Sequence, residues 1–276
     1  MSRLRAWFLL PAWLWLWVLF LAPLAIVGGY SLLTRGTYGG VELPWTFESY
    51  WRTLDPLYGA ILLRSVVIAA MATGLCLVLA FPLALFIARA NERKNLYLNL
   101  VILPFWTSFL VRTYAWLFLL RDTGLVNTVL LRLGITSAPL PLLYNDGAVV
   151  LGLVYGFLPF MVLPLYATIE RMDPALLEAA ADLGARPWRT FFRVVVPLAR
   201  PGIWAGVVLV FIPCLGAYLT PDLLGGGKSV MIGNLVQNQF TTARDWPFGA
   251  AISLGLMLIA TGALAIVYWR GPKEIL

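Results

Sequence analysis

The chain has 276 residues, of which 61% are hydrophobic and 12% charged, and its mean hydropathy is +0.85. A soluble domain is nearer half apolar and a quarter charged, so the composition indicates an integral membrane protein. The net charge of +7 is better explained by Lys and Arg in cytoplasmic loops than by nucleic-acid binding. The sequence has no histidine, which excludes histidine-based acid–base catalysis and histidine metal ligands. Cys76 and Cys214 lie inside apolar runs and are expected to be packing residues, with no metal site.

Six apolar runs reach or approach the roughly 20 residues that a membrane-spanning helix needs. They cover residues 7–33, 60–88, 98–120, 148–169, 202–219 and 248–268. Arg3 and Arg5 precede the first run as in a signal peptide, but the run is too long for one and is expected to stay as an anchor. Short helices are expected in the loops at 47–54, 126–133 and 230–240. The predicted fold class is an all-α integral membrane protein with six transmembrane helices.

Prolines interrupt several of these runs. Broken helices are tolerated where they line a cavity or pack on protein, which suits a transporter, although a simple kink is the commoner explanation for any single proline. The prolines concerned are Pro82, Pro104, Pro159, Pro164 and Pro213.

The positive charges indicate an orientation. Lys and Arg gather on the cytoplasmic side of membrane proteins. One side of the predicted topology, which includes both termini, carries Arg3, Arg5, Arg89, Arg93, Lys94, Arg171, Arg186, Arg189, Arg193, Arg200, Arg270 and Lys273. The opposite side carries only Arg35, Arg52, Arg121, Arg132, Lys228 and Arg244. Both termini are therefore expected in the cytoplasm.

The longest polar-interrupted segment between two apolar runs is Asp173–Pro201, on the predicted cytoplasmic side. Asp173 suits an N-cap and Pro174 the first helical position, so a helix is expected to begin there. Gly184 is expected to end that helix, and Pro187 to start a second one. A well-capped hairpin outside the bilayer suggests that another protein docks on it.

From Glu178 the hairpin reads E-A-A, three residues, G, nine residues and V-x-V-P, ending at Pro197. This pattern resembles the EAA loop of ABC importer permeases of the type I fold, which ends I-x-L-P; Val194 and Val196 are conservative replacements. In that family the loop sits in a cleft of the ATPase subunit and transmits its closure. The resemblance implies coupling roles for Glu178, Ala179, Ala180, Asp182, Gly184 and Pro197. Trp188, Phe191 and Phe192 are expected to anchor the second helix against the membrane-side core.

Three further segments narrow the resemblance. ILPFWTSFLVRTYAW begins at Ile102, GAYLTPDLLGGGKSVMIGNLVQNQF at Gly216 and RDWPFGA at Arg244. Together they resemble permease subunits of spermidine/putrescine ABC importers, the PotB type, over nearly the whole chain. GGGKS also looks like part of a phosphate-binding loop, but the first glycine of that motif would fall at Asp222 and no strand precedes it.

The resemblance implies a single permease domain over 1–276, with the family core at about 60–270 and the EAA loop at 173–201. It implies a multi-pass subunit of a bacterial inner membrane that forms half of a translocation pathway and is not itself an enzyme. The implied partners are a cytoplasmic ATPase dimer, a second homologous permease subunit and an external binding protein. No cofactor is expected on this chain, because ATP and Mg would bind the ATPase.

A polyamine is a flexible polycation, which carboxylates or aromatic faces could hold. The predicted spans contain almost no acid, so aromatic residues are the pathway candidates, with Asp222 as the nearest anion. The candidates are Trp106, Tyr114, Tyr155, Tyr218 and Asp222. In a single helix Trp106 and Thr113 would share a face, seven residues apart, and Tyr218 and Asp222 are one turn apart. Each aromatic residue is also explained by ordinary packing.

Two arginines fall inside predicted spans, where charges are costly and usually functional. Arg64 is expected to extend to the outer interface. Arg112 is expected to pair with an acid such as Asp122 or to face a partner subunit.

Alternative functions remain open. The solute can differ within the importer family, for example an amino-acid derivative, because selectivity there resides largely in the binding protein. A secondary carrier would need a midplane acid or an inverted repeat, and neither is evident. A membrane-embedded enzyme would need a nucleophile–base pair or metal ligands, for which the chain lacks candidates.

Overall fold

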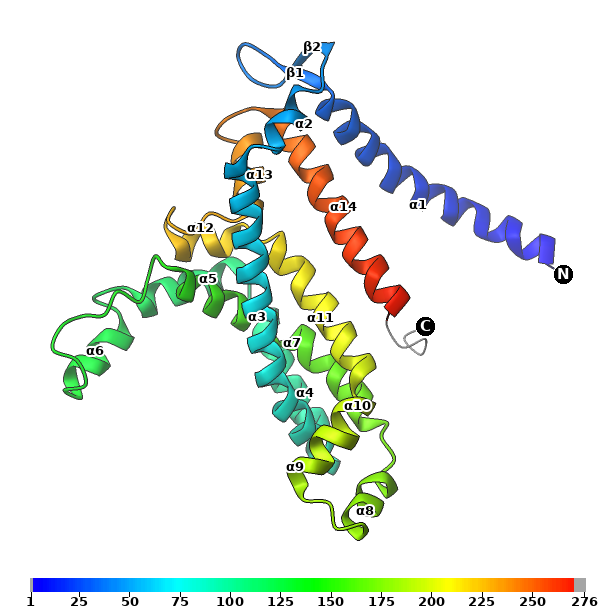
Figure 1. Ribbon diagram of the computed structural model, residues 1–276, viewed down its shortest axis with the longest axis vertical. Coiled ribbons are helices and arrows are strands. Elements are labelled where there is room, and N and C mark those ends of the chain that lie inside the picture. The colour runs from blue at the N-terminus through cyan, green and yellow to red at the C-terminus, as the bar shows by residue number, and fades with distance from the viewer. Residues whose placement is uncertain (1, 271–276) are drawn as a thin grey trace. The chain divides into compact units, whose positions relative to one another are not determined.

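The computed structural model describes residues 2–270, and they are mostly helical (Figure 1). The described chain forms two compact units. The first unit contains residues 2–60 and 235–261, and the second contains residues 61–234 and 262–270.

The first unit combines helices with a small antiparallel sheet that the sequence did not predict. Thr34 of the first strand lies opposite Glu42 of the second. The expected short helix near 47–54 is confirmed. Besides the ends of two helices described below, this unit contains α1 (Ser2–Ser31), β1 (Leu33–Arg35), β2 (Val41–Trp45), α2 (Glu48–Thr53) and most of α14 (Trp246–Arg270).

A buried carboxylate organises this unit. Asp245 is 3% exposed, its Oδ2 lies 2.8 Å from Arg52 Nη1, and its Oδ1 accepts a hydrogen bond from the Phe248 backbone N–H at the start of α14. The Arg52 guanidinium lies 4.1 Å from the centre of the Phe248 ring. Burial disfavours the charge on Arg52, but Asp245 outweighs burial and raises the pKa of that guanidinium.

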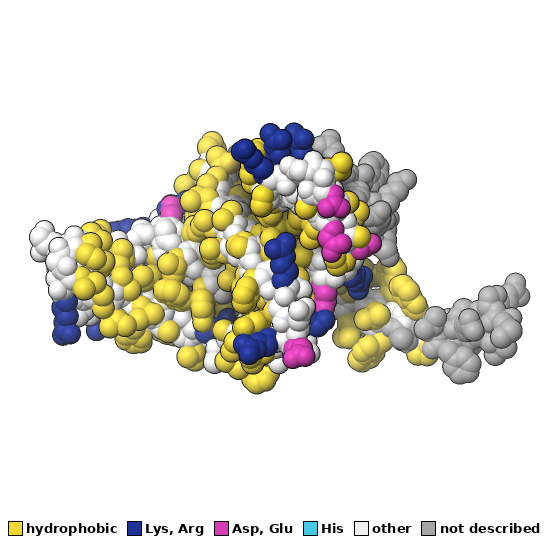
Figure 2. Space-filling model, turned by 90° about the horizontal axis from the view of Figure 1, so that it is seen from below, with side chains coloured by type: hydrophobic (Ala, Val, Ile, Leu, Met, Phe, Trp, Pro, Cys, Tyr) yellow, Lys and Arg dark blue, Asp and Glu magenta, His cyan; other side chains and the backbone are white. Residues whose placement is uncertain are grey.

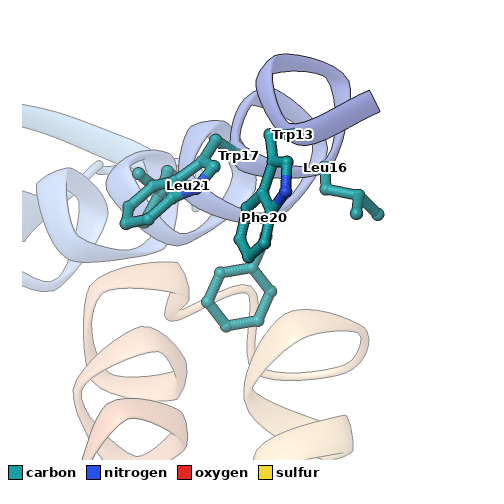
Figure 3. A pocket seen from close by; sticks show the side chains of 5 residues that line it. All are labelled: Trp13, Leu16, Trp17, Phe20 and Leu21. Carbon is teal, nitrogen blue, oxygen red and sulfur yellow. The ribbon is translucent and has the colours of Figure 1, made fainter. Parts of the chain in front are cut away.

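Helix α1 is apolar on all sides in its described part. A shallow pocket of about 360 Å³ on it is lined only by Trp13, Leu16, Trp17, Phe20 and Leu21 (Figure 3). This lining has no charged group, so it suits lipid or another membrane helix and offers nothing to fix a polar solute.

The second unit holds most of the remaining helices. They are α3 (Pro56–Ala88), η1 (Asn91–Arg93), α4 (Lys94–Ile102), η2 (Leu103–Trp106), α5 (Phe109–Leu120), α6 (Leu125–Arg132), α7 (Asp146–Glu170), α8 (Ala175–Asp182), α9 (Pro187–Thr190), η3 (Phe191–Val195), α10 (Val196–Leu198), α11 (Arg200–Leu215), α12 (Leu219–Gly225) and α13 (Ile232–Phe240). Helix α3 begins, and α13 ends, in the first unit. The short helices expected near 126–133 and 230–240 are α6 and α13.

The core of the second unit lies between α3, α7 and α11. Its buried side chains include Ile68, Ala72, Cys76, Ala84, Leu153, Met161, Leu165, Val210 and Cys214. The two cysteines are free and buried, as predicted for packing residues.

Glycines bring α7 and α11 close together. A Cβ at Gly202 would lie 2.7 Å from the Pro164 carbonyl oxygen, and one at Gly206 would lie 2.5 Å from Met161 Sδ. Such distances leave no room for a side chain at either glycine, so α11 approaches the backbone of α7 at Gly202 and the Met161 side chain at Gly206.

Three described helices are long and apolar enough to cross a membrane: Trp13–Ser31 within α1, and the helices α3 and α7. Two bent pairs, Asn91–Trp106 with Phe109–Arg132 and Pro187–Leu198 with Arg200–Leu215, raise the number to five if each pair is one span. A shorter apolar helix covers Trp246–Gly262. These segments follow the predicted order, while the number of six crossings stays a prediction.

The expectation that Trp106 and Thr113 share one helix face is wrong. The chain bends by 87° between η2 and α5, so Trp106 and Thr113 lie on different helices and share no face. Thr107 and Ser108 have extended backbone at the break, and Thr107 Oγ1 donates to the Pro104 carbonyl oxygen at 2.7 Å. A hydroxyl that bonds to nearby backbone in this way competes with helix continuation.

Candidate functional site

The hairpin at 173–201 begins with the predicted cap. Asp173 Oδ1 accepts a hydrogen bond of 3.0 Å from the Ala175 N–H. The helix α8 starts at Ala175, one residue later than predicted, so Pro174 is the residue that precedes it. The side chains of Glu178 and Asp182 are exposed on this two-turn helix.

The end of α8 is a Schellman motif. The Gly184 N–H donates to the Ala181 carbonyl oxygen at 2.8 Å, and the Ala185 N–H donates to that of Ala180 at 3.0 Å. Gly184 has φ +73°, which lies in the left-handed region that glycine occupies without strain. The predicted helix end is therefore confirmed at this residue.

The second half of the hairpin is anchored by one aromatic residue. The Phe191 ring lies 5.1 Å from that of Phe81 in an edge-on arrangement, and Val195 is buried. The expectation that Trp188 and Phe192 also anchor this half is wrong, because both side chains are more than half exposed. They sit on the outward side of the α9–η3 segment, where a partner can contact them.

A groove of about 340 Å³ runs between α3 and the hairpin. Apolar side chains and one arginine, Arg89, line it. The lining residues are Leu85, Arg89, Leu177, Ala181, Ala185, Pro187, Thr190, Phe191 and Val195. Ala181 of α8 and Ala185 after it thus line the groove, while Glu178, Ala179 and Asp182 are exposed.

The surface around the hairpin is mostly apolar and carries scattered charged side chains. Figure 2 views the molecule from the end at which Figure 1 places α8 and α9, and shows Lys, Arg, Asp and Glu side chains scattered over a mostly apolar surface. Nearby, Lys94 Nζ of α4 lies 2.5 Å from Glu170 Oε1 at the end of α7. This ion pair holds the chain just before the hairpin begins.

The hairpin also continues directly into the core. Pro197 lies in α10, half-buried, and α11 follows within three residues. Gly202 and Gly206 of α11 pack against α7, which enters the hairpin from the other side. A movement of the hairpin therefore acts on both core helices at once.

The pathway candidates all lie in the second unit, but the structure brings few of them together. Tyr155 of α7 contacts Trp116 of α5, with ring centres 5.5 Å apart, rather than Tyr114. Tyr114, Tyr155 and Tyr218 are partly exposed. Trp106 is 82% exposed at the bend before α5.

Tyr218 and Asp222 lie one helical turn apart, as their spacing in the sequence predicted. The Asp222 N–H donates to the Tyr218 carbonyl oxygen at 3.0 Å, so the two residues are one turn apart, and the Asp222 side chain is exposed. The same carbonyl oxygen accepts a bond of 2.7 Å from Asn234 Nδ2, which ties the start of α12 to α13.

A second carboxylate was missed by sequence reasoning. Asp146 Oδ1, at the start of α7, lies 2.7 Å from Arg64 Nη2 and also accepts a hydrogen bond from Ser229 Oγ. Arg64 therefore forms an ion pair with the start of α7, and its extension to the outer interface stays a prediction. Neighbouring Ser65 accepts a bond of 2.7 Å from the Ile232 N–H, so α3 and α7 hold the glycine-rich segment before α13.

Comparison with known proteins agrees with the hairpin pattern. The family model described as binding-protein-dependent transport system inner membrane component matches residues 80–272. The chain is 46% identical over 260 residues to the spermidine/putrescine transport system permease protein PotB of Salmonella typhimurium, covering 94% of this chain and 90% of the relative. It is 42% identical over 260 residues to the protein of that name from Haemophilus influenzae, covering 94% and 91%.

A solved structure shows the same fold. The chain resembles a bacterial alginate ABC transporter, solved in complex with an alginate pentasaccharide-bound periplasmic protein, with a TM-score of 0.75 at 17% identity over 99% of this chain and 96% of that one. The long PotB matches and the family model agree on one assignment: the chain belongs to the family of inner membrane components of binding-protein-dependent transport systems.

Proposed function

We propose that this chain is the membrane-spanning subunit of an ATP-driven importer and forms half of a pathway for polyamines such as spermidine and putrescine. The observation that carries the proposal is the capped, exposed hairpin at 173–201, joined to both core helices of a chain that is 46% identical to PotB. A hairpin with capped helices that is exposed to this extent is typical of a surface on which another protein docks.

The hairpin is the proposed docking element for a cytoplasmic ATPase. Glu178, Ala179, Asp182 and Gly184 present an exposed surface with little bulk, and the groove behind α8 gives the helix room to move. ATP and Mg bind the ATPase in this scheme and not the present chain. The hairpin and both termini then lie in the cytoplasm, as the distribution of Lys and Arg predicts.

The outward side is proposed to receive a substrate-loaded binding protein. Cations would then pass Tyr218 and Asp222 and reach the aromatic residues Trp106, Tyr114 and Tyr155. An exposed carboxylate and aromatic faces both attract an ammonium group, which supports a cationic solute. A second permease subunit completes the pathway.

Two measurements on the reconstituted complex test the proposal. The chain is co-expressed with the products of its neighbouring genes, and co-purification of an ATPase is the first expected result. Labelled spermidine or putrescine is then expected to enter proteoliposomes only with ATP and the binding protein. Uptake by this polypeptide alone would refute the importer assignment, and uptake of an amino-acid derivative instead would refute the polyamine assignment.

A further inference from the structure

Arg112 is a partly buried cation, and two of its three guanidinium nitrogens have no hydrogen-bond acceptor among the described residues. It lies in the first turns of α5, and its Nε and Nη1 atoms are buried without a partner among residues 2–270. The centre of its guanidinium lies 4.6 Å from the middle of the Phe105 ring and 5.6 Å from that of Phe109. Ring faces attract a positive charge, but they do not replace the oxygen acceptors that guanidinium N–H groups need.

Other arginines of the chain do find acceptors. Arg64 pairs with Asp146 and Arg52 pairs with Asp245. Asp122, the acid nearest to Arg112 in the sequence, forms no ion pair with it in the described chain. Nη2 is not among these buried atoms, so an acceptor from outside this chain can reach the guanidinium there, and a guanidinium left without one is costly.

The position of Arg112 on the helix indicates where that acceptor approaches. Thr113 and Leu120 lie on the buried face of α5, whereas Val111, Ala115 and Phe118 form an exposed apolar face. At 3.6 residues per turn, Arg112 lies on the border between these faces, beside Val111 and Ala115. A molecule that covers the exposed face therefore reaches the guanidinium.

Three kinds of molecule could cover the exposed face of α5 beside Arg112: lipid, the transported polyamine or a second permease subunit. Lipid tails cover an apolar face but offer no acceptor. A protonated polyamine carries only donors and is repelled by a guanidinium. We infer that α5 contacts the second permease subunit and that a carboxylate of that subunit pairs with Arg112. This inference rests on the proposed function, which requires a second membrane half.

The test measures assembly of the two permease subunits rather than uptake. The complex is purified through a tag on the second permease, and the recovered amount of this chain is quantified. Arg112→Met removes the charge and keeps an apolar stem, and we expect recovery to fall about tenfold or more, as when one partner of a buried pair is truncated. Arg121→Met is the matched control, because Arg121 ends the same helix, lies 5.5 Å from the Phe118 ring and is exposed.

Full recovery of Arg112→Met overturns the inference. A second measurement avoids dependence on a variant that misfolds: a photoreactive amino acid replaces Ala115 in an otherwise unchanged chain. Cross-linking to the second permease supports the inference, and cross-linking to lipid alone overturns it. If the unmodified chain is not recovered with the second permease, the proposed function itself fails. If the unmodified chain and Arg112→Met are recovered equally well, only the role of Arg112 is refuted.

Discussion

Gly184 is the position at which backbone conformation alone decides the shape of the hairpin at 173–201. Its φ is +73°, and a Cβ added there would meet no heavy atom within 4 Å. A side chain therefore has room, and its cost is the left-handed backbone, about 1–2 kcal/mol for an L-residue. That energy shifts an equilibrium by a factor of about 5–30. Gly184→Ala is expected to disfavour the docking-competent turn by this factor, and Gly184→Val by more, because β-branching adds strain.

The assay follows ATPase retention during purification and substrate-dependent ATP hydrolysis in proteoliposomes. Asn tolerates left-handed backbone, so the expected order of both signals is Gly, then Asn, then Ala, then Val. Gly227→Val is the matched control, because Gly227 has φ +76° and equally open surroundings but lies outside the hairpin. The control is expected to retain the ATPase. If Gly184→Val kept full retention and full coupled hydrolysis, the docking account of the hairpin would be wrong.

Three further predictions test other parts of the molecule. Asp245→Asn weakens the buried pair with Arg52 and is expected to lower the free energy of unfolding by about 1–3 kcal/mol, so an unchanged thermal midpoint would contradict the anchoring role. Gly202→Ala places a methyl group against the backbone of α7 and is expected to cost about 1–3 kcal/mol in thermal unfolding, whereas Gly74→Ala, at an open helical site, should not destabilise. Asp222→Asn is expected to lower polyamine uptake by the reconstituted complex with normal assembly, and unchanged uptake would remove this residue from the pathway.

The hairpin was predictable because its signals are local. An acidic cap, a proline and a glycine act within a few residues of their own positions, so their order in the sequence specifies where α8 begins and ends. The apolar runs were predictable for a similar reason, since their length and composition alone qualify them as spans. The pattern from Glu178 to Pro197 then led to the family that the comparisons show.

The break at Thr107 and Ser108 was not predictable in the same way. Pro104 marks an interruption of this apolar run in the sequence, but Thr107 and Ser108 can either continue a helix or end it, because hydroxyl side chains are compatible with helices when they bond to the preceding turn. Here Thr107 bonds to the Pro104 carbonyl oxygen while its own backbone is extended. The tertiary environment decides between these outcomes, and it also places Trp106 away from Thr113.

The ion pair of Arg64 and Asp146 shows a second limit of sequence reasoning. The two residues are separated by 82 positions, and Ser229 is 83 positions from Asp146. Residues so far apart become neighbours only through the packing of α3 and α7. No local pattern marks Asp146 as a partner, although Arg64 within an apolar span was a sign that some carboxylate would meet it.

In the proposed function, the placement of the hairpin gives an event at the ATPase a route to the pathway candidates. The hairpin is the connection between α7 and α11, and α7 carries Tyr155 while α11 leads to Tyr218 and Asp222. Gly202 and Gly206 let α11 approach α7 closely, so little space is left between the two helices to absorb a displacement. We therefore expect an ATPase that pulls on α8 to move both helices together, so that candidates at separate points along the pathway change position in a single step.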